Sequence, residues 1–273
     1  MRRAGRLRRA LTPDLRPLHE SRDYRLLTAG TLITGLGTQA ALVALPYQVY
    51  VISHEPVMQS IASGLRFVRR DRALLGSFAI DLLAMTFGMP RALFAVMSIT
   101  LFHAGAVGTG ALYASVSAGA TVAALTTGWL TSARWLGRIV IAAVAVWGLA
   151  IAVSGLVASI VVACVLLAIA GAADSVSAVC RSTISQTLTP DSVRGRMSSV
   201  FSLVVASGPR LGDVEAGTVA SAATPRFSVA SGGLACVASV GIVAALFPAL
   251  ARYDGRAARP IEPAATAALR EAA

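Results

Sequence analysis

The chain has 273 residues, of which 56% are hydrophobic and only 14% are charged, and its mean hydropathy is +0.71. Soluble domains usually have about a quarter of their residues charged, so this composition excludes an ordinary water-soluble enzyme and predicts a multi-span membrane protein. All of the 24 basic residues are arginine, which excludes a P-loop or a Schiff-base lysine.

The first predicted elements are a tail, a span and a linker. Residues 1–25 form a polar tail with eight arginines, which we expect in the cytoplasm. Residues 26–52 are apolar and long enough to cross a bilayer, so they are predicted to be the first transmembrane helix. Residues 53–72 are basic and are predicted to form an amphipathic helix at the membrane surface. Their apolar residues recur at helical spacing: Met58, Ile61, Leu65 and Val68.

Six further apolar runs follow, and they predict a six-helix transmembrane bundle over residues 73–248. The runs lie at about 73–97, 104–130, 138–156, 159–181, 197–221 and 227–248. They lack the period-two alternation of a barrel, and a backbone in lipid must satisfy its own hydrogen bonds, so we predict an all-α protein. The segment 249–273 is rich in Ala, Pro and Arg and is predicted to be disordered.

Arginines alternate between the loops of this bundle. They gather before the first run and after the second, fourth and sixth runs, whereas the opposite loops contain only Arg226. Because arginine-rich loops stay on the cytoplasmic side, both ends of the bundle are predicted to face the cytoplasm. The protein is therefore predicted to lie in the cytoplasmic membrane. The same rule explains the basic charge without a nucleic-acid partner, and we expect none.

The first span conflicts with this orientation. Both the tail 1–25 and the linker 53–72 require the cytoplasm, but one helix cannot connect two cytoplasmic ends. We therefore expect that an odd number of spans is absent between about Ser53 and Pro56. The alternative is that residues 26–52 form a re-entrant or surface segment.

Several stretches resemble one branch of a known family. They are GLGTQAALVALPYQVYVI near the start, SIASGLRFVRRDRALLGSFAIDLLAMTFGMPRALF within 60–97, GAADSVSAVCRSTISQTLTPDSVRGRMSSV and SGPRLGDVEAG. These resemble, in order, the first helix, the central segment with the seventh helix, the tenth helix with its following loop, and the eleventh helix of the enterobactin-exporter-like branch of the major facilitator superfamily. The resemblance covers nearly all of residues 26–250.

The resemblance implies twelve helices in two halves, of which the second to the sixth are absent here. It therefore implies a partial major-facilitator fold, with one N-terminal helix and a C-terminal six-helix half-bundle. It also implies proton-coupled efflux of a siderophore or drug-like small molecule, with weak or no activity in this shortened chain. The alternative is a non-transporting remnant, or a half-transporter subunit that pairs as a homodimer or with another half-transporter.

Ionisable residues inside the apolar runs are the candidate substrate or proton path, because charge in a membrane interior is costly and faces a wet cavity or a partner. The candidates are Asp81, Asp174, Arg210, Asp213 and Glu215. In the functional interpretation Asp81 or Asp213 exchanges a proton and Arg210 meets an anionic group of the substrate. In the structural alternative, Arg210 and Asp213, which are three positions apart, neutralise each other, or a salt bridge forms to Asp174 on the neighbouring helix.

Other residues have weaker signals. Gln39 and Arg91 are predicted as path lining, and Arg181 as an anchor at the cytoplasmic interface. The three tryptophans are predicted to be interfacial anchors: Trp129, Trp135 and Trp147. The chain has no HExxH, GxSxG or CxxC motif, so we expect neither an enzyme nor a metal site or cofactor.

Overall fold

The computed structural model describes residues 57–127, 130, 133–190 and 194–255. Every regular element in these ranges is a helix. The helices are α4 (Val57–Arg70), α5 (Arg72–Phe87), α6 (Leu93–Thr100), α7 (Gly105–Thr126), α8 (Leu136–Leu156), α9 (Ile160–Leu188), α10 (Arg194–Ala222), α11 (Pro225–Leu246) and the short α12 (Pro248–Ala251). The predicted all-helical architecture is therefore confirmed for this part of the chain.

Four of the described helices are long and apolar enough to cross a membrane: α7, α8, α9 and α11. With 29 residues, α10 is as long as α9, but it contains charged residues at its middle, Arg210 and Asp213 among them. Because a span must satisfy its own backbone and hide its charges, α10 requires protein or water around its polar face.

The predicted apolar run 73–97 is not one continuous helix. Its first part, α5, ends at Phe87, where the N–H of Gly88 donates to the carbonyl of Ala84 at 2.7 Å. Pro90 follows, and it lacks an N–H and disfavours helical backbone in the residue before it. The chain resumes helical structure only at Leu93, so the run is divided into α5 and α6.

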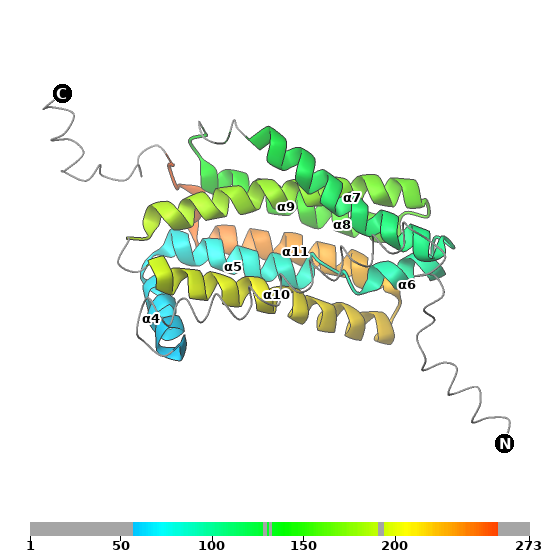
Figure 1. Ribbon diagram of the computed structural model, residues 1–273, viewed down its shortest axis with the longest axis horizontal. Coiled ribbons are helices and arrows are strands. Elements are labelled where there is room, and N and C mark those ends of the chain that lie inside the picture. Colours follow the sequence, from blue (N-terminus) through cyan, green and yellow to red (C-terminus); the bar gives the residue numbers. More distant parts are fainter. Residues whose placement is uncertain (1–56, 128–129, 131–132, 191–193, 256–273) are drawn as a thin grey trace, which may run out of the picture. The chain divides into compact units, whose positions relative to one another are not determined.

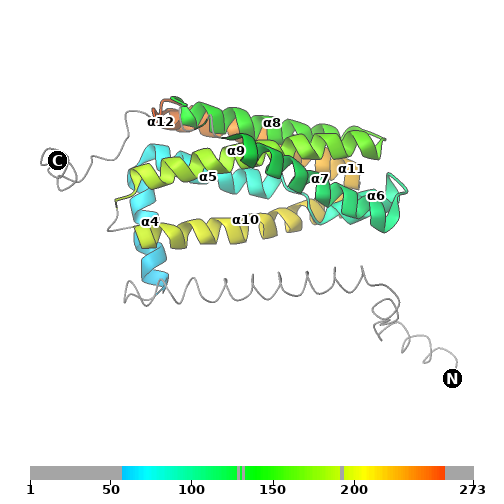
Figure 2. The same ribbon diagram turned by 45° about the horizontal axis from the view of Figure 1, so that its top comes forward.

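Most of the helices run side by side along the long axis of the bundle, whereas α4 lies across one end (Figures 1 and 2). This is the end where α5 and α10 begin and α9 finishes. The main core is built around Trp147, Ile80 and Val144, which are at most 2% exposed. A second, smaller core joins α4, α5 and α10 through five residues: Val68, Leu74, Phe78, Met197 and Val200.

Two glycines bring α7 and α9 into close contact. A Cβ atom on Gly119 would overlap the carbonyl of Ala168, and one on Gly171 would overlap the carbonyl of Val116. The two backbones are therefore in direct contact, as is usual where small residues meet between helices in a membrane. This contact fixes the position of the polar half of α9 that follows Gly171.

Candidate functional site

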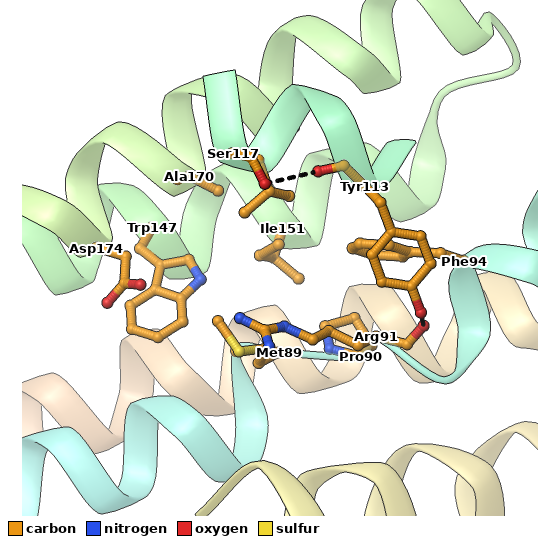
Figure 3. Close-up of a pocket in the computed structure, with 13 residues that line it drawn as sticks. Met89, Pro90, Arg91, Phe94, Tyr113, Ser117, Trp147, Ile151, Ala170 and Asp174 are labelled. Carbon is orange, nitrogen blue, oxygen red and sulfur yellow. Dashed lines mark hydrogen bonds between the residues drawn. The ribbon is translucent and has the colours of Figure 1, made fainter. Parts of the chain in front are cut away.

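The break between α5 and α6 forms the floor of a pocket (Figure 3). The pocket contains about 600 Å³ of empty space, part of it open to the outside. Its walls come from α6, α7, α8 and α9. The lining residues are Gly88, Met89, Pro90, Arg91, Phe94, Tyr113, Val116, Ser117, Trp147, Ile151, Ala170, Gly171 and Asp174.

Aromatic side chains hold one wall of this pocket. The rings of Phe94 and Tyr113 meet edge to face, with centroids 5.1 Å apart and an interplanar angle of 67°. The Tyr113 hydroxyl also donates to the carbonyl oxygen of Arg91 at 2.9 Å (Figure 3). These two contacts connect α6 and the non-helical segment to α7 and fix the position of the Arg91 backbone.

Arg91 and Asp174 place opposite charges in the pocket. Arg91 is exposed and forms no ion pair with another described residue. Asp174 has 24% of its side chain exposed and lies next to Trp147, at the left edge of the view in Figure 3. A pocket with aromatic walls and one unpaired guanidinium can hold a ligand with an apolar or aromatic body and an anionic group.

Asp174 also belongs to a buried ion triad, which consists of Asp81, Arg181 and Asp174. The Nη1 atom of Arg181 lies 2.9 Å from Oδ1 of Asp81, and Nη2 lies 3.9 Å from Oδ1 of Asp174. The side chains of Arg181 and Asp81 are 6% and 3% exposed. The Arg181–Asp81 pair therefore joins α5 to α9 where solvent is almost excluded, whereas Asp174 lies at the edge of this region.

The triad is incompletely satisfied by hydrogen bonds. The short contact of Arg181 with Asp81 is not aligned as a hydrogen bond, and Nε of Arg181 and the hydroxyl of Ser177 have no hydrogen-bond partner among the described residues. Buried polar atoms normally find partners, so these atoms are available to water or to a rearranged pairing. Two carboxylates share one guanidinium, which leaves one excess negative charge when all three are ionised.

The triad also lies between two hollows. Asp174 lines the pocket of Figure 3, whereas Asp81 and Arg181 line a smaller hollow of about 200 Å³ of empty space between α5, α9 and α10. Ser185 and Phe201 line this hollow and also a wider one near the end of α9. Polar side chains thus follow one face of α9 from Asp174 onwards, at helical spacing.

The sequence-predicted residues on α10 lie elsewhere. Asp213 accepts a hydrogen bond from the N–H of Ala92 at 3.1 Å, so it supports the α5–α6 break from outside the pocket. Arg210 is exposed and Glu215 is partly exposed, and neither belongs to the triad or lines one of the pockets described above. Gln39 lies outside the described residues.

The structural alternative for Arg210 is not found, and two predictions are wrong. No ion pair between Arg210 and Asp213 forms among the described residues, and the ionic partner of Asp174 is Arg181 on its own helix. Arg181 itself is buried, because Asp81 on the neighbouring helix compensates its charge, and it is not an interfacial anchor. Trp147 is 2% exposed and lines the pocket, because α8 turns this face toward the core.

One sequence signal could have identified the triad. Asp174, Ser177 and Arg181 are spaced by three and four residues, which places all three on one face of an otherwise apolar helix. The pairing with Asp81 has no local signal, because it depends on how α5 and α9 pack.

Trp135 was predicted as an anchor, and the guanidinium groups of Arg134 and Arg138 stack on its ring at 4.9 and 4.7 Å. Trp129 lies outside the described residues.

A family model and the curated relatives of this chain both indicate the same family of transporters. The family described as transmembrane secretion effector matches residues 7–271. The enterobactin exporter EntS of Citrobacter koseri is 30% identical over 217 residues, which are 79% of this chain and 51% of that protein. EntS of Escherichia coli O139:H28 and EntS of Shigella boydii serotype 18 are each 30% identical over 213 residues, which are 77% of this chain and 50% of those proteins.

The chain thus spans about half the length of the curated relatives it matches. No solved structure matches it significantly. The family consists of transporters rather than enzymes, and its members are multi-pass proteins of the cytoplasmic membrane. The four described helices that are long and apolar enough to cross a membrane agree with this location. The chain belongs to the transmembrane secretion effector family of the major facilitator superfamily.

Proposed function

We propose that this chain is part of an efflux transporter that exports a siderophore or drug-like small molecule in exchange for protons. The observation that carries the proposal is the buried triad of Asp81, Arg181 and Asp174 at the boundary between two hollows. The relatives named as enterobactin exporters support the same direction of transport.

The cargo binds in the pocket of Figure 3. Phe94, Tyr113 and Trp147 supply flat apolar surface, and Arg91 supplies the cation for an anionic group of the cargo. This assignment places the anion-binding arginine at the α5–α6 break and leaves Arg210 to a different role.

The triad exchanges the proton. With Asp81 and Asp174 ionised around Arg181, the buried site has one excess negative charge, and Arg91 is the further cation near Asp174. One proton on either carboxylate removes that excess and releases the guanidinium to pair with the other. Asp174 lines the cargo pocket, so the binding of an anionic cargo and the binding of a proton both change the charge balance at this carboxylate.

The architecture that accompanies this function follows the sequence analysis. In this proposal residues 1–25 are a cytoplasmic tail, 26–52 the first transmembrane helix, 53–72 the interfacial linker and 73–248 the six-helix half-bundle. The predicted disorder of 249–273 is wrong for its first residues, because α12 is helical and Leu250 and Tyr253 pack in the main core. The path of a two-half transporter lies between its halves. Export by this chain alone is therefore weak or absent, and the pocket binds cargo without moving it efficiently.

Binding and flux are tested separately. Enterobactin is titrated into the purified chain in detergent, and binding is followed by tryptophan fluorescence, since Trp147 lines the pocket. Arg91→Gln is expected to weaken binding at least about tenfold, as for the loss of one charged contact. The matched control is Arg226→Gln, an exposed arginine at the start of α11, which should bind as the wild type does. Equal binding by both variants would contradict the cargo assignment.

Proton exchange has its own readout. In weakly buffered detergent solution, enterobactin binding to the wild type should change the number of bound protons, which a pH indicator dye records. Asp81→Asn combined with Asp174→Asn should abolish this change while cargo binding is retained. In proteoliposomes the wild-type chain should show little enterobactin flux under a proton gradient, and robust flux would overturn the statement that this chain is deficient alone.

A second candidate is a half-transporter subunit that pairs with a second half. The outward face of α10 favours it, because Arg210 is exposed near the middle of this helix beside Leu211 and Val214, which are 53% and 68% exposed. Lipid does not solvate a mid-span guanidinium well, so this face requires a protein or water partner. Cysteine crosslinking at Leu211 should trap a homodimer in membranes if two copies pair, and only monomer would exclude this pairing.

A further inference from the structure

Three arginines form one exposed face of α4. Arg66, Arg69 and Arg70 are separated by three and four residues, so they lie within about one third of the helix circumference. All three side chains are exposed, and none forms an ion pair with another described residue. We call these three residues the arginine face.

The nearest acid in the sequence does not neutralise this face. Asp71 accepts hydrogen bonds from the N–H groups of Ala73 and Leu74, at 2.8 and 2.9 Å, and so caps the N-terminus of α5. Its carboxylate is committed to the dipole of that helix. The arginine face therefore keeps a charge of +3 on a helix of 14 residues.

The opposite side of α4 is fixed to the bundle. Val68 is 1% exposed and packs in the smaller core with Leu74, Phe78 and Met197. This contact holds α4 across the end of the bundle, crosswise to α5 and α10 (Figures 1 and 2). Transmembrane helices tilt on average only about 20° from the membrane normal, so a helix crosswise to them at their end is expected to run along the membrane plane.

The end where α4 lies carries other cationic groups. Arg72 begins α5, and Arg138 stacks on Trp135 within the first turn of α8. Arg134 stacks on the same ring, but its charge is paired with Asp254, whose Oδ2 lies 2.7 Å from Nε of Arg134. A basic end with an arginine-stacked tryptophan is typical of the cytoplasmic interface. On α4 itself, Leu65 is 39% exposed and adjoins the arginine face, so an apolar contact is available next to the charges.

From these observations we propose that the arginine face of α4 binds the headgroups of anionic phospholipids in the cytoplasmic leaflet. Guanidinium groups pair with phosphate oxygens, while the arginine stems and Leu65 lie against the glycerol and upper acyl region. Val68 connects α4 to α5 and α10, so lipid binding also restrains the ends of the helices that carry Asp81 and Asp213. The proposal does not depend on the proposed transport function.

Hydrogen exchange of the full chain in nanodiscs tests this. One sample contains phosphatidylcholine alone, and the other contains phosphatidylcholine with 30% phosphatidylglycerol as the anionic probe. Amides of residues 57–70 should exchange about tenfold more slowly with the anionic lipid at low salt, and 0.5 M NaCl should remove most of the difference, because a surface charge interaction is screened. Equal exchange in the two lipids would overturn the proposal, and this comparison requires no variant.

Variants identify the residues. The combined change of Arg66, Arg69 and Arg70 to Gln should abolish the lipid-dependent protection. Changing all three to Lys should preserve most of it, because the anionic surface attracts Lys and Arg charges about equally. Arg226→Gln at the start of α11 is the matched single-site control and should leave the protection unchanged. Protection that persists in the Gln variant would assign lipid binding to another surface and contradict the arginine face.

Discussion

The Nη1 atom of Arg181 lies 2.9 Å from Oδ1 of Asp81, so one buried ion pair joins the middle of α5 to the polar half of α9. The nearest alternative partner of Arg181 is Asp174, 3.9 Å from Nη2. Loss of Arg181 therefore leaves two negative charges, whereas loss of either aspartate leaves one neutral ion pair. This asymmetry distinguishes a shared guanidinium from a simple pair.

Arg181→Gln should destabilise the protein far more than Asp81→Asn. Without Arg181 two carboxylates remain beside each other with no cation between them, and breaking a buried pair costs roughly 3–5 kcal/mol. Without the Asp81 charge, Arg181 still pairs with Asp174, so a loss of about 1–2 kcal/mol is expected. Denaturant unfolding in detergent measures both, and Arg181→Gln combined with Asp81→Asn should be more stable than Arg181→Gln alone. Equal losses for the two single variants would contradict the triad.

Gly119→Ala should lower the melting temperature, whereas Gly110→Ala on the same helix should not. A Cβ on Gly119 would overlap the carbonyl of Ala168 and push α7 away from α9, but a Cβ on Gly110 meets nothing within 4 Å. At the open site, alanine should even stabilise the helix by about 0.5–1 kcal/mol, because glycine loses more conformational entropy on folding. A thermal unfolding assay in detergent compares the two, and an equal response would refute the close helix contact.

The stability of the wild type relative to Tyr253→Phe should fall at alkaline pH. Tyr253 follows α12 and is 8% exposed, and burial raises the pKa of its hydroxyl above the ordinary value of 10.0. The unfolded chain then releases the phenolic proton at a lower pH than the folded chain. The contribution is fully present below pH 10 and is lost as the pH rises through the folded pKa.

The measurement is the difference in melting temperature between the wild type and Tyr253→Phe from pH 8 to pH 11. Phenylalanine cannot ionise, so the melting temperature of the wild type should fall relative to that of the variant as the pH rises above 10. A difference that stays constant over this range would show that Tyr253 ionises equally easily in both states.

The three cysteines should react with maleimide in two classes. Cys180 and Cys236 are fully buried, whereas Cys164 is partly exposed near the start of α9. Native protein in detergent should therefore take up one label rapidly, and the other two only after denaturation, because buried thiols react through opening of the structure. Intact mass spectrometry counts the labels. Cys164→Ser should remove the fast label, and rapid uptake of three labels by the native chain would contradict the packing of α9 against α8 and α5.

The hydropathy pattern was sufficient to predict the helical membrane class, because a backbone in lipid has no alternative to internal hydrogen bonding. It also located α7, α8, α9 and α11, whose apolar runs are long and uninterrupted. The same pattern missed the division into α5 and α6, since the apolar run continues through the break. Pro90 was the local signal for that break, and only the packing of Tyr113 against it shows why the break forms a pocket.

The sequence by itself determined that charges such as Asp81 and Asp174 lie within apolar helices and therefore need compensation. Only the tertiary structure decided which cation compensates them, because Arg181 comes from a position 100 residues away from Asp81 along the chain. Periodicity assigns a residue to a face of its own helix, but the neighbour of that face depends on close contacts such as that of Gly119 with Ala168. Local sequence therefore fixes the cost of each buried charge, and the packing of the helices fixes its partner.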